Sequence, residues 1–103
     1  RAPLDNGVGF FYLIQIVPDL DPLRVKLGWT SDVSMRLDAH RTAAPTAELV
    51  KCWPCRKVWE IAAMNSVTRI ECVNIGNEVF RCTDVDTMIA RCDAFFALMP
   101  EQH

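Results

Sequence analysis

Several features are scarce or missing in this chain of 103 residues, and each absence excludes a class of protein. No run of about 18 apolar residues occurs, so the sequence predicts no membrane-spanning helix and no membrane partner. Positive charge is not in surplus either: 13 acidic residues outnumber 11 basic ones, which gives a net charge of −2. This balance argues against strong nucleic-acid binding by the domain alone, because such binding depends on neutralising phosphates.

A disulfide framework is not indicated, because the chain has five cysteines, an odd number. We therefore expect free thiols and a reducing, cytoplasmic location. Cys52 and Cys55 have CxxC spacing, but no second CxxC and no HxxxH pair completes a zinc site. Three interpretations stay open for this motif: partly buried thiols at a strand–helix turn shaped by Pro54, a redox motif, or a metal site.

Low-complexity segments and internal repeats are also absent, and half of the residues are hydrophobic. The length and composition predict one globular domain with a single core. We expect an irregular lead-in over residues 1–8 and the domain over residues 9–100. Because the chain begins with Arg1 and shows no signal-peptide pattern, we expect either a domain excised from a longer protein or a processed N-terminus.

The hydrophobic pattern predicts alternating strands and helices along this domain. The expected strands are Gly9–Val17, Leu23–Gly28, Ala47–Trp53 and two short stretches between Ile70 and Cys82 around a turn at 74–77, and the expected helices are Ser31–Arg41, Arg56–Thr68 and one capped by Thr83 and Asp84. The second helix should bury Val58, Trp59, Ala62 and either Met64 or Ser66, and the third Val85, Met88, Ile89, Cys92, Phe95, Phe96 and Met99. This order predicts an α/β (α+β) fold with a small, mainly antiparallel three-stranded sheet flanked by helices.

The most informative stretch lies where the second strand ends at Gly28 and the next helix begins after Thr30, Ser31 and Asp32. Arg36 and His40 are four residues apart and therefore share one face of that helix. A glycine at a strand end lets a ligand approach the backbone closely, and an arginine beside a histidine suits a phosphate oxyanion. The pattern indicates a phosphodiester as the ligand.

The order of these residues resembles the GIY-YIG endonuclease superfamily. Gly9-Phe10-Phe11-Tyr12 stands for the first motif, Lys26-Leu27-Gly28 for the second, Arg36 and His40 follow at the family spacings, and Gly76-Asn77-Glu78-Val79-Phe80 stands for a late motif. Lys26 replaces the second family tyrosine, which makes the chain most similar to the phage-type branch with K-[IL]-G. The late asparagine of the homing-endonuclease branch has no counterpart here, and Glu78 is no safe substitute for it.

This resemblance implies a GIY-YIG-like fold and metal-dependent hydrolysis of DNA. Glu60, on a later helix, would bind Mg²⁺ (or Mn²⁺), and Arg36 would stabilise charge on the phosphorane. Tyr12, with a depressed pKa, would orient or deprotonate the water, and His40 or Lys26 would assist proton transfer. We expect Gly28, Trp29, Thr30 and Arg41 to bind substrate, and a fused or partner domain to supply affinity for DNA.

Two other readings of the sequence remain. One is a catalytically degenerate module of the same fold that binds nucleic acid or a protein, which the acidic balance and Lys26 favour. The other is an unrelated small α/β domain in which Cys52 and Cys55 are redox-active or bind a metal. A structure separates these readings in part, because the nuclease requires Tyr12, Lys26, Arg36, His40 and Glu60 to lie around one pocket.

Overall fold

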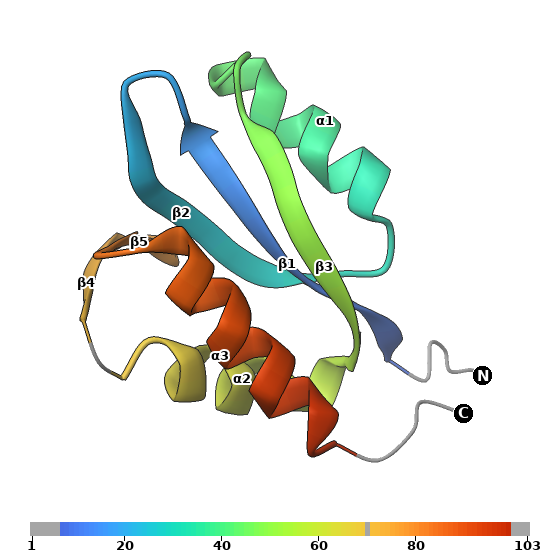
Figure 1. The fold of residues 1–103 in the computed structure, drawn as a ribbon. Helices are drawn as coiled ribbons and strands as arrows, with labels where there is room; N and C mark the ends of the chain where they lie inside the picture. The colour runs from blue at the N-terminus through green and yellow to red at the C-terminus, as the bar shows by residue number, and fades with distance from the viewer. Residues whose placement is uncertain (1–6, 70, 100–103) are drawn as a thin grey trace.

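A computed structural model describes residues 7–69 and 71–99 and shows an α+β fold (Figure 1). The elements follow in the order β1 (Val8–Val17), β2 (Asp21–Thr30), α1 (Val33–Ala43), β3 (Glu48–Arg56), the 3₁₀ helix η1 (Lys57–Trp59), α2 (Glu60–Val67), β4 (Cys72–Gly76), β5 (Val79–Cys82) and α3 (Val85–Ala97). Among these residues no helix is long and apolar enough to cross a membrane.

The sheet contains five antiparallel strands in the order β3-β1-β2-β5-β4. The predicted antiparallel α+β fold is confirmed, but a three-stranded sheet was too small. The sheet has two more strands than predicted because the β4–β5 hairpin belongs to the same sheet. Val25 on β2 lies opposite Phe80 on β5, so the hairpin extends the sheet beyond β2.

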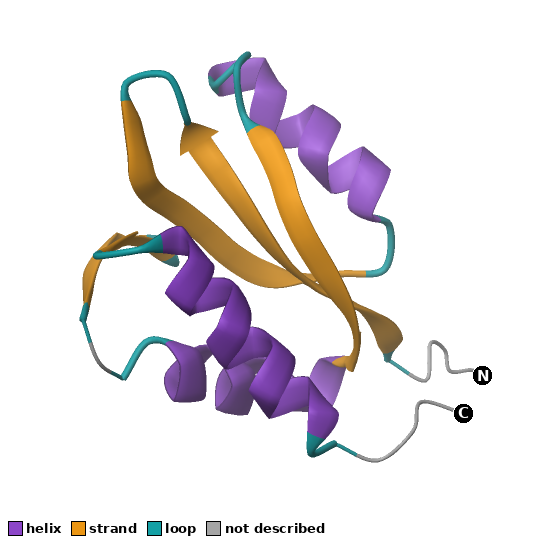
Figure 2. Ribbon diagram, viewed as in Figure 1, coloured by secondary structure: helices purple, strands orange, loops and turns teal. Residues whose placement is uncertain are grey.

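Helices cover both faces of this sheet, α1 on one side and α2 with α3 on the other (Figure 2). Side chains of β1 alternate between the two faces. Phe11 and Leu13 pack in the larger core with α2 and α3, whereas Tyr12 and Ile14 pack on the α1 side. Burial on both faces explains why β1 is an almost continuous apolar run.

Side-chain caps fix the beginnings of the two longer helices. The Asp32 carboxylate accepts a hydrogen bond from the Met35 amide at 3.0 Å, and Asp84 accepts one from the Thr87 amide at 3.2 Å. The prediction that Thr83 and Asp84 begin the last helix is confirmed in its position, with Asp84 as the N-cap. Its apolar stripe also faces the core, since Met88 and Cys92 are buried there.

The third strand is longer than predicted, because it continues past Trp53 to Arg56. A proline inside a strand is tolerated at a sheet edge, where its missing N–H is not needed. Pro54 lies in the edge strand β3, which pairs only with β1. The CxxC motif therefore lies within a strand and not at a strand–helix turn.

The second helix begins later than predicted and turns a different face inward. Residues 57–59 form a 3₁₀ turn, and α2 runs from Glu60 to Val67. Its buried residues are Ala63, Met64 and Val67, whereas Val58 and Ala62, expected inside, are exposed. Trp59 packs against the core as expected, and Ser66 is exposed.

Smaller differences concern strand ends and turns. The first strand begins at Val8, inside the predicted lead-in, and residues 1–6 of that lead-in lie outside the described residues. The second strand extends from Asp21 to Thr30, two residues further at each end than predicted. The late hairpin is confirmed, but its turn lies at Asn77 and Glu78.

Candidate functional site

Tyr12 lies on the interior strand β1, which is flanked by β2 and the edge strand β3. Its backbone lies opposite Gly28 on one side and Cys52 on the other, and its side chain is 2% exposed. A Cβ atom added to Gly28 would stand 2.6 Å from the Tyr12 hydroxyl oxygen. Gly28 therefore makes room for the tyrosine, and its lack of a side chain is explained by this packing.

His40 reaches Tyr12 from the covering helix α1. The two ring centroids are 6.1 Å apart, with the rings edge to face. Burial lowers the pKa of His40 from its ordinary value, and the charges of Lys26 and Arg36 lower it further. Its Nε2 atom is buried and has no hydrogen-bond partner among the described residues. A neutral imidazole with an unused nitrogen is suited to accept a proton.

The pKa of Tyr12 is raised, and this corrects the depressed value expected from the resemblance. Burial is the largest cause, since it disfavours the phenolate. Arg36 opposes the shift, and the carboxylates of Glu78 and Glu60 add to it. Tyr12 is therefore a neutral phenol at pH 7, able to donate a hydrogen bond to a water or a phosphate oxygen but not a ready base.

Three of the charged residues predicted for the site act electrostatically on Tyr12 or His40. Arg36 acts on both Tyr12 and His40, Lys26 acts on His40, and Glu60 acts on Tyr12. The side chains come from β1, β2, α1 and α2, and α2, which begins at Glu60, covers the face of the sheet opposite to α1. Arg36 is exposed and lines a cavity of about 310 Å³ at the beginning of α1, together with Thr30 and Asp32.

Glu60 begins α2 and is the carboxylate expected to hold a metal ion. Its side chain is largely buried, and Lys57 Nζ lies 3.1 Å from its Oε1 atom. Within residues 7–69 and 71–99 no group of three or more His, Cys, Asp or Glu side chains is placed to hold a metal. One carboxylate still fits Mg²⁺, which usually keeps several waters and is completed by substrate phosphates.

The four residues expected to bind substrate have different surroundings. Gly28 faces Tyr12, whereas Trp29 faces the opposite core, donates from Nε1 to the Cys55 carbonyl at 2.8 Å and lies beneath Lys57. The Thr30 hydroxyl is hydrogen-bonded to the Asp32 backbone, which fixes the entry to α1. Arg41 Nε donates to the Ala47 carbonyl at 2.9 Å. The structure thus gives the last three side chains contacts within the fold.

Glu78 is a residue of the site region that the sequence analysis did not select. It lies in the β4–β5 turn, and its carboxylate is 3.4 Å from Lys26 Nζ. The same ammonium donates to the Asn77 carbonyl at 2.5 Å. Only the pairing of β5 with β2 brings this turn beside Lys26. One signal in the sequence could have drawn attention to Glu78. It occupies the second position of a two-residue hairpin turn, where glycine is usual.

The cysteines do not form a joint site at the CxxC motif. Cys55 packs in the core under α2 and α3, while Cys52 packs on the α1 side with Tyr12. Three residues apart on a strand, they lie on opposite faces of β3. One metal ion or a Cys52–Cys55 disulfide would require the strand to break, so the arrangement favours separate, partly or fully buried thiols.

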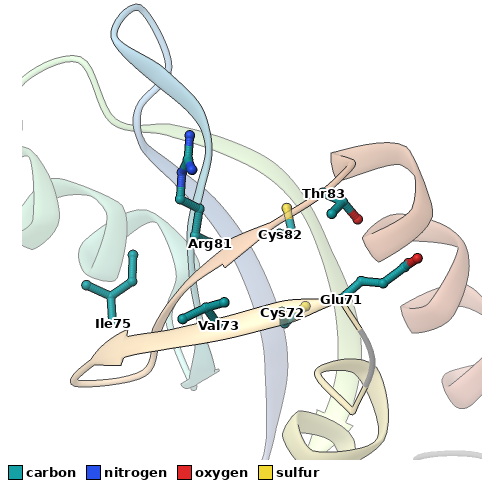
Figure 3. Close-up of a pocket in the computed structure, with 7 residues that line it drawn as sticks. All are labelled: Glu71, Cys72, Val73, Ile75, Arg81, Cys82 and Thr83. Atoms are coloured by element: carbon teal, nitrogen blue, oxygen red, sulfur yellow. The ribbon is translucent and has the colours of Figure 1, made fainter.

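A larger cavity, of about 520 Å³, lies on the β4–β5 hairpin away from these residues (Figure 3). It is lined by Glu71, Cys72, Val73, Ile75, Arg81, Cys82 and Thr83. Burial raises the pKa values of Cys72 and Cys82, so neither thiol is a ready nucleophile. Arg81 is engaged with Asp21 at 3.2 Å. Glu71 is paired with Arg91 at 3.0 Å, so both charged side chains of the lining are already engaged within the fold.

Comparison with known proteins finds no match: no family model, no curated protein and no solved structure is similar enough to place the chain in a family.

Proposed function

We propose that this domain is a metal-dependent endonuclease of GIY-YIG type that hydrolyses DNA phosphodiester bonds. The observation that carries the proposal is the buried Tyr12–His40 pair, with an unpartnered histidine nitrogen and the charges of Arg36, Lys26 and Glu60 close enough to shift its titration. Phosphodiester hydrolysis needs a positioned water, a proton acceptor and positive charge beside the phosphate oxygens.

The residue roles follow from these protonation states. His40 is neutral and would accept the proton of the attacking water once that water reaches the buried Nε2 atom, and the Tyr12 hydroxyl would orient the water as a hydrogen-bond donor. Arg36 is exposed at the cavity and stabilises negative charge as it develops on the phosphorus-bound oxygens. Lys26 supplies a second positive charge, or protonates the leaving oxygen. In this assignment the histidine is the base and the tyrosine is the hydrogen-bond donor. The sequence analysis instead expected Tyr12 to orient or deprotonate the water and His40 to assist proton transfer.

A bound Mg²⁺ or Mn²⁺ would polarise the scissile phosphate and neutralise its charge. Glu60 is the residue that would hold it, with waters and the phosphate as the remaining ligands. Lys57 competes for the same carboxylate at 3.1 Å. Because that lysine side chain is more than half exposed, it can turn away into solvent when a divalent ion arrives.

The net charge of −2 supports the proposal that another domain binds the DNA and this domain cleaves it. Phosphate contacts supply most non-specific affinity for DNA, and this domain offers few of them. A fused or partner DNA-binding domain would hold the substrate, and the site described above would cut it.

A degenerate binding module is the second candidate, and Lys26 is the observation that favours it. Its ammonium is engaged by the Asn77 carbonyl and the Glu78 carboxylate, as expected for a residue that only braces the hairpin. In that case the domain would bind nucleic acid or a protein without cutting. Cleavage assays separate the two candidates directly.

The test compares nicking of supercoiled plasmid by wild-type protein, Arg36→Ala and Arg69→Ala in Mg²⁺ or Mn²⁺. Both variants remove one exposed arginine, but Arg69 follows α2, and its charge is not among the causes that shift the pKa of Tyr12 or His40. We expect Arg36→Ala to lower the rate by about 100-fold or more, and Arg69→Ala to keep it. Equal loss in both variants, or no metal-dependent nicking by wild type at high protein concentration, would contradict the nuclease.

A further inference from the structure

The turn that joins β4 to β5 has a backbone that its sequence does not favour. Asn77 has φ 52° and Glu78 has φ 63°, so both residues of the two-residue turn are left-handed. Turns with positive φ at both positions favour Asn-Gly, because glycine has no Cβ to clash. Asparagine tolerates this region, but glutamate rarely adopts it. A glutamate at the second position is therefore unfavourable for the turn itself.

The contacts of this turn all go to the strand that carries the second motif. The Leu27 amide donates to the Glu78 carbonyl at 3.2 Å, which holds the turn against β2. Lys26 Nζ lies between two oxygens of the turn, the Asn77 carbonyl at 2.5 Å and Glu78 Oε1 at 3.4 Å. Although Lys26 has a flexible side chain, only 15% of it is exposed.

Glu78 also acts electrostatically on Tyr12. Its charge is one of the causes that raise the pKa of Tyr12, together with Glu60. Gly28 lies opposite Tyr12 on the neighbouring strand, and Lys26 is two residues before Gly28 on β2. The side chains of Lys26 and Tyr12 therefore lie on the same face of the sheet. The turn therefore lies beside Lys26, whose side chain is on the same face of the sheet as Tyr12.

We propose that Glu78 is a positioning residue that fixes the Lys26 ammonium at the candidate site. The proposal rests on the nuclease function proposed above, because it gives Lys26 a place in that reaction. Residues held in sparsely populated backbone regions occur preferentially at functional sites, where the surrounding structure stabilises them. Here the strained residue is the one that supplies the negative charge to Lys26. Glycine would relieve the turn but leave the ammonium with one partner.

Two substitutions in the same turn distinguish a Glu78 that positions Lys26 for the reaction from a Glu78 that only stabilises the hairpin. Glu78→Gly removes both the left-handed strain and the carboxylate, whereas Asn77→Gly also relieves a positive φ but keeps the carboxylate and the carbonyl. The measurements are the melting temperature, and kcat and KM for metal-dependent cleavage of a short duplex of fixed sequence. Glu78→Gln, which keeps an oxygen acceptor at the same place, serves as the conservative variant.

We expect both glycine variants to melt at or above the wild-type temperature, since a surface ion pair contributes little to stability. Glu78→Gly should lower kcat about tenfold or more, with KM changed less than about twofold. Asn77→Gly should keep the wild-type kcat, and Glu78→Gln should recover part of it. If Glu78→Gly cleaves as fast as wild type, Glu78 does not position Lys26, although the nuclease stands. If wild type and Asn77→Gly both fail to cleave, the proposed function fails and this inference falls with it.

Discussion

Gly28 and Tyr12 are complementary residues on neighbouring strands, and their contact predicts a specific coupling between substitutions. In Gly28→Ala the new Cβ would lie 2.6 Å from the Tyr12 hydroxyl oxygen and 2.9 Å from Cζ, so the ring must shift within a packed sheet. We expect a loss of about 1–3 kcal/mol in the free energy of unfolding, measured by urea denaturation.

The double variant Gly28→Ala/Tyr12→Phe provides the control for that prediction. Phenylalanine removes the atom in closest contact but keeps the ring, so part of the strain disappears. The two losses should be less than additive, with a coupling of about 0.5–2 kcal/mol. Strictly additive losses would show that the glycine is needed for another reason.

His40 predicts how stability depends on pH near neutrality. Burial, with the charges of Lys26 and Arg36, lowers the pKa of this histidine in the folded state below its ordinary value of 6.5. As pH falls through that ordinary value, the unfolded chain takes up the proton first, so stability falls with pH. The decrease ends below the folded-state pKa, where both states are protonated.

The measurement is the urea midpoint at pH 7.5 and pH 5.5 for wild type and His40→Phe. Phenylalanine keeps a ring against Tyr12 but cannot titrate. Wild type should lose more stability than the variant between these two pH values. The same loss in both proteins would mean that His40 titrates normally and is not held neutral by its surroundings.

At the scale of elements, the strands and helices with strong local signals could be predicted. The apolar run of β1 and the capped, amphipathic α3 were both found near their predicted positions. The end of β3 was not, because Pro54 was treated as a boundary although an edge strand tolerates proline. The inward face of α2 was missed because a 3₁₀ turn precedes the helix and shifts its register.

The face alternation of β3 predicts how its two cysteines react. Burial raises the pKa of Cys55 to about 12, with a further contribution from Glu60, so this thiol is a poor nucleophile. In native protein at pH 8, iodoacetamide should modify partly exposed Cys52 well before buried Cys55, as read by peptide mass spectrometry. Mild oxidation should give no Cys52–Cys55 disulfide, and finding one would contradict the strand assignment.

At the scale of the whole molecule, the site depends on pairings that local patterns do not encode. Arg36 and His40 could be placed together from their helical spacing alone. Glu78 could not, because it reaches Lys26 only when β5 pairs with β2 in one register. The raised pKa of Tyr12 was also beyond the sequence, since it results from burial by α1 and from carboxylates on two distant elements.

The overall charge implies that the proposed nuclease depends on another domain or protein for its affinity for DNA. With a net charge of −2, the domain has little general attraction for a polyanion, so the proposed cutting site requires another source of DNA affinity. Four of its charged residues, Lys26, Arg36, Glu60 and Glu78, act electrostatically on Tyr12 or His40. Because DNA affinity and cleavage would come from different parts of the assembly, the central claim is tested by measuring cleavage and not binding.

The most direct measurement is therefore plasmid nicking as a function of Mg²⁺ or Mn²⁺ by wild type, Glu60→Ala and Glu48→Ala. Glu48 is an exposed carboxylate on β3 and serves as the matched control. The nuclease assignment predicts metal-dependent nicking by wild type and Glu48→Ala, and none by Glu60→Ala at an unchanged melting temperature. Equal nicking by Glu60→Ala would contradict it. So would the absence of nicking by wild type at every metal concentration when the protein is concentrated enough to offset its weak affinity for DNA.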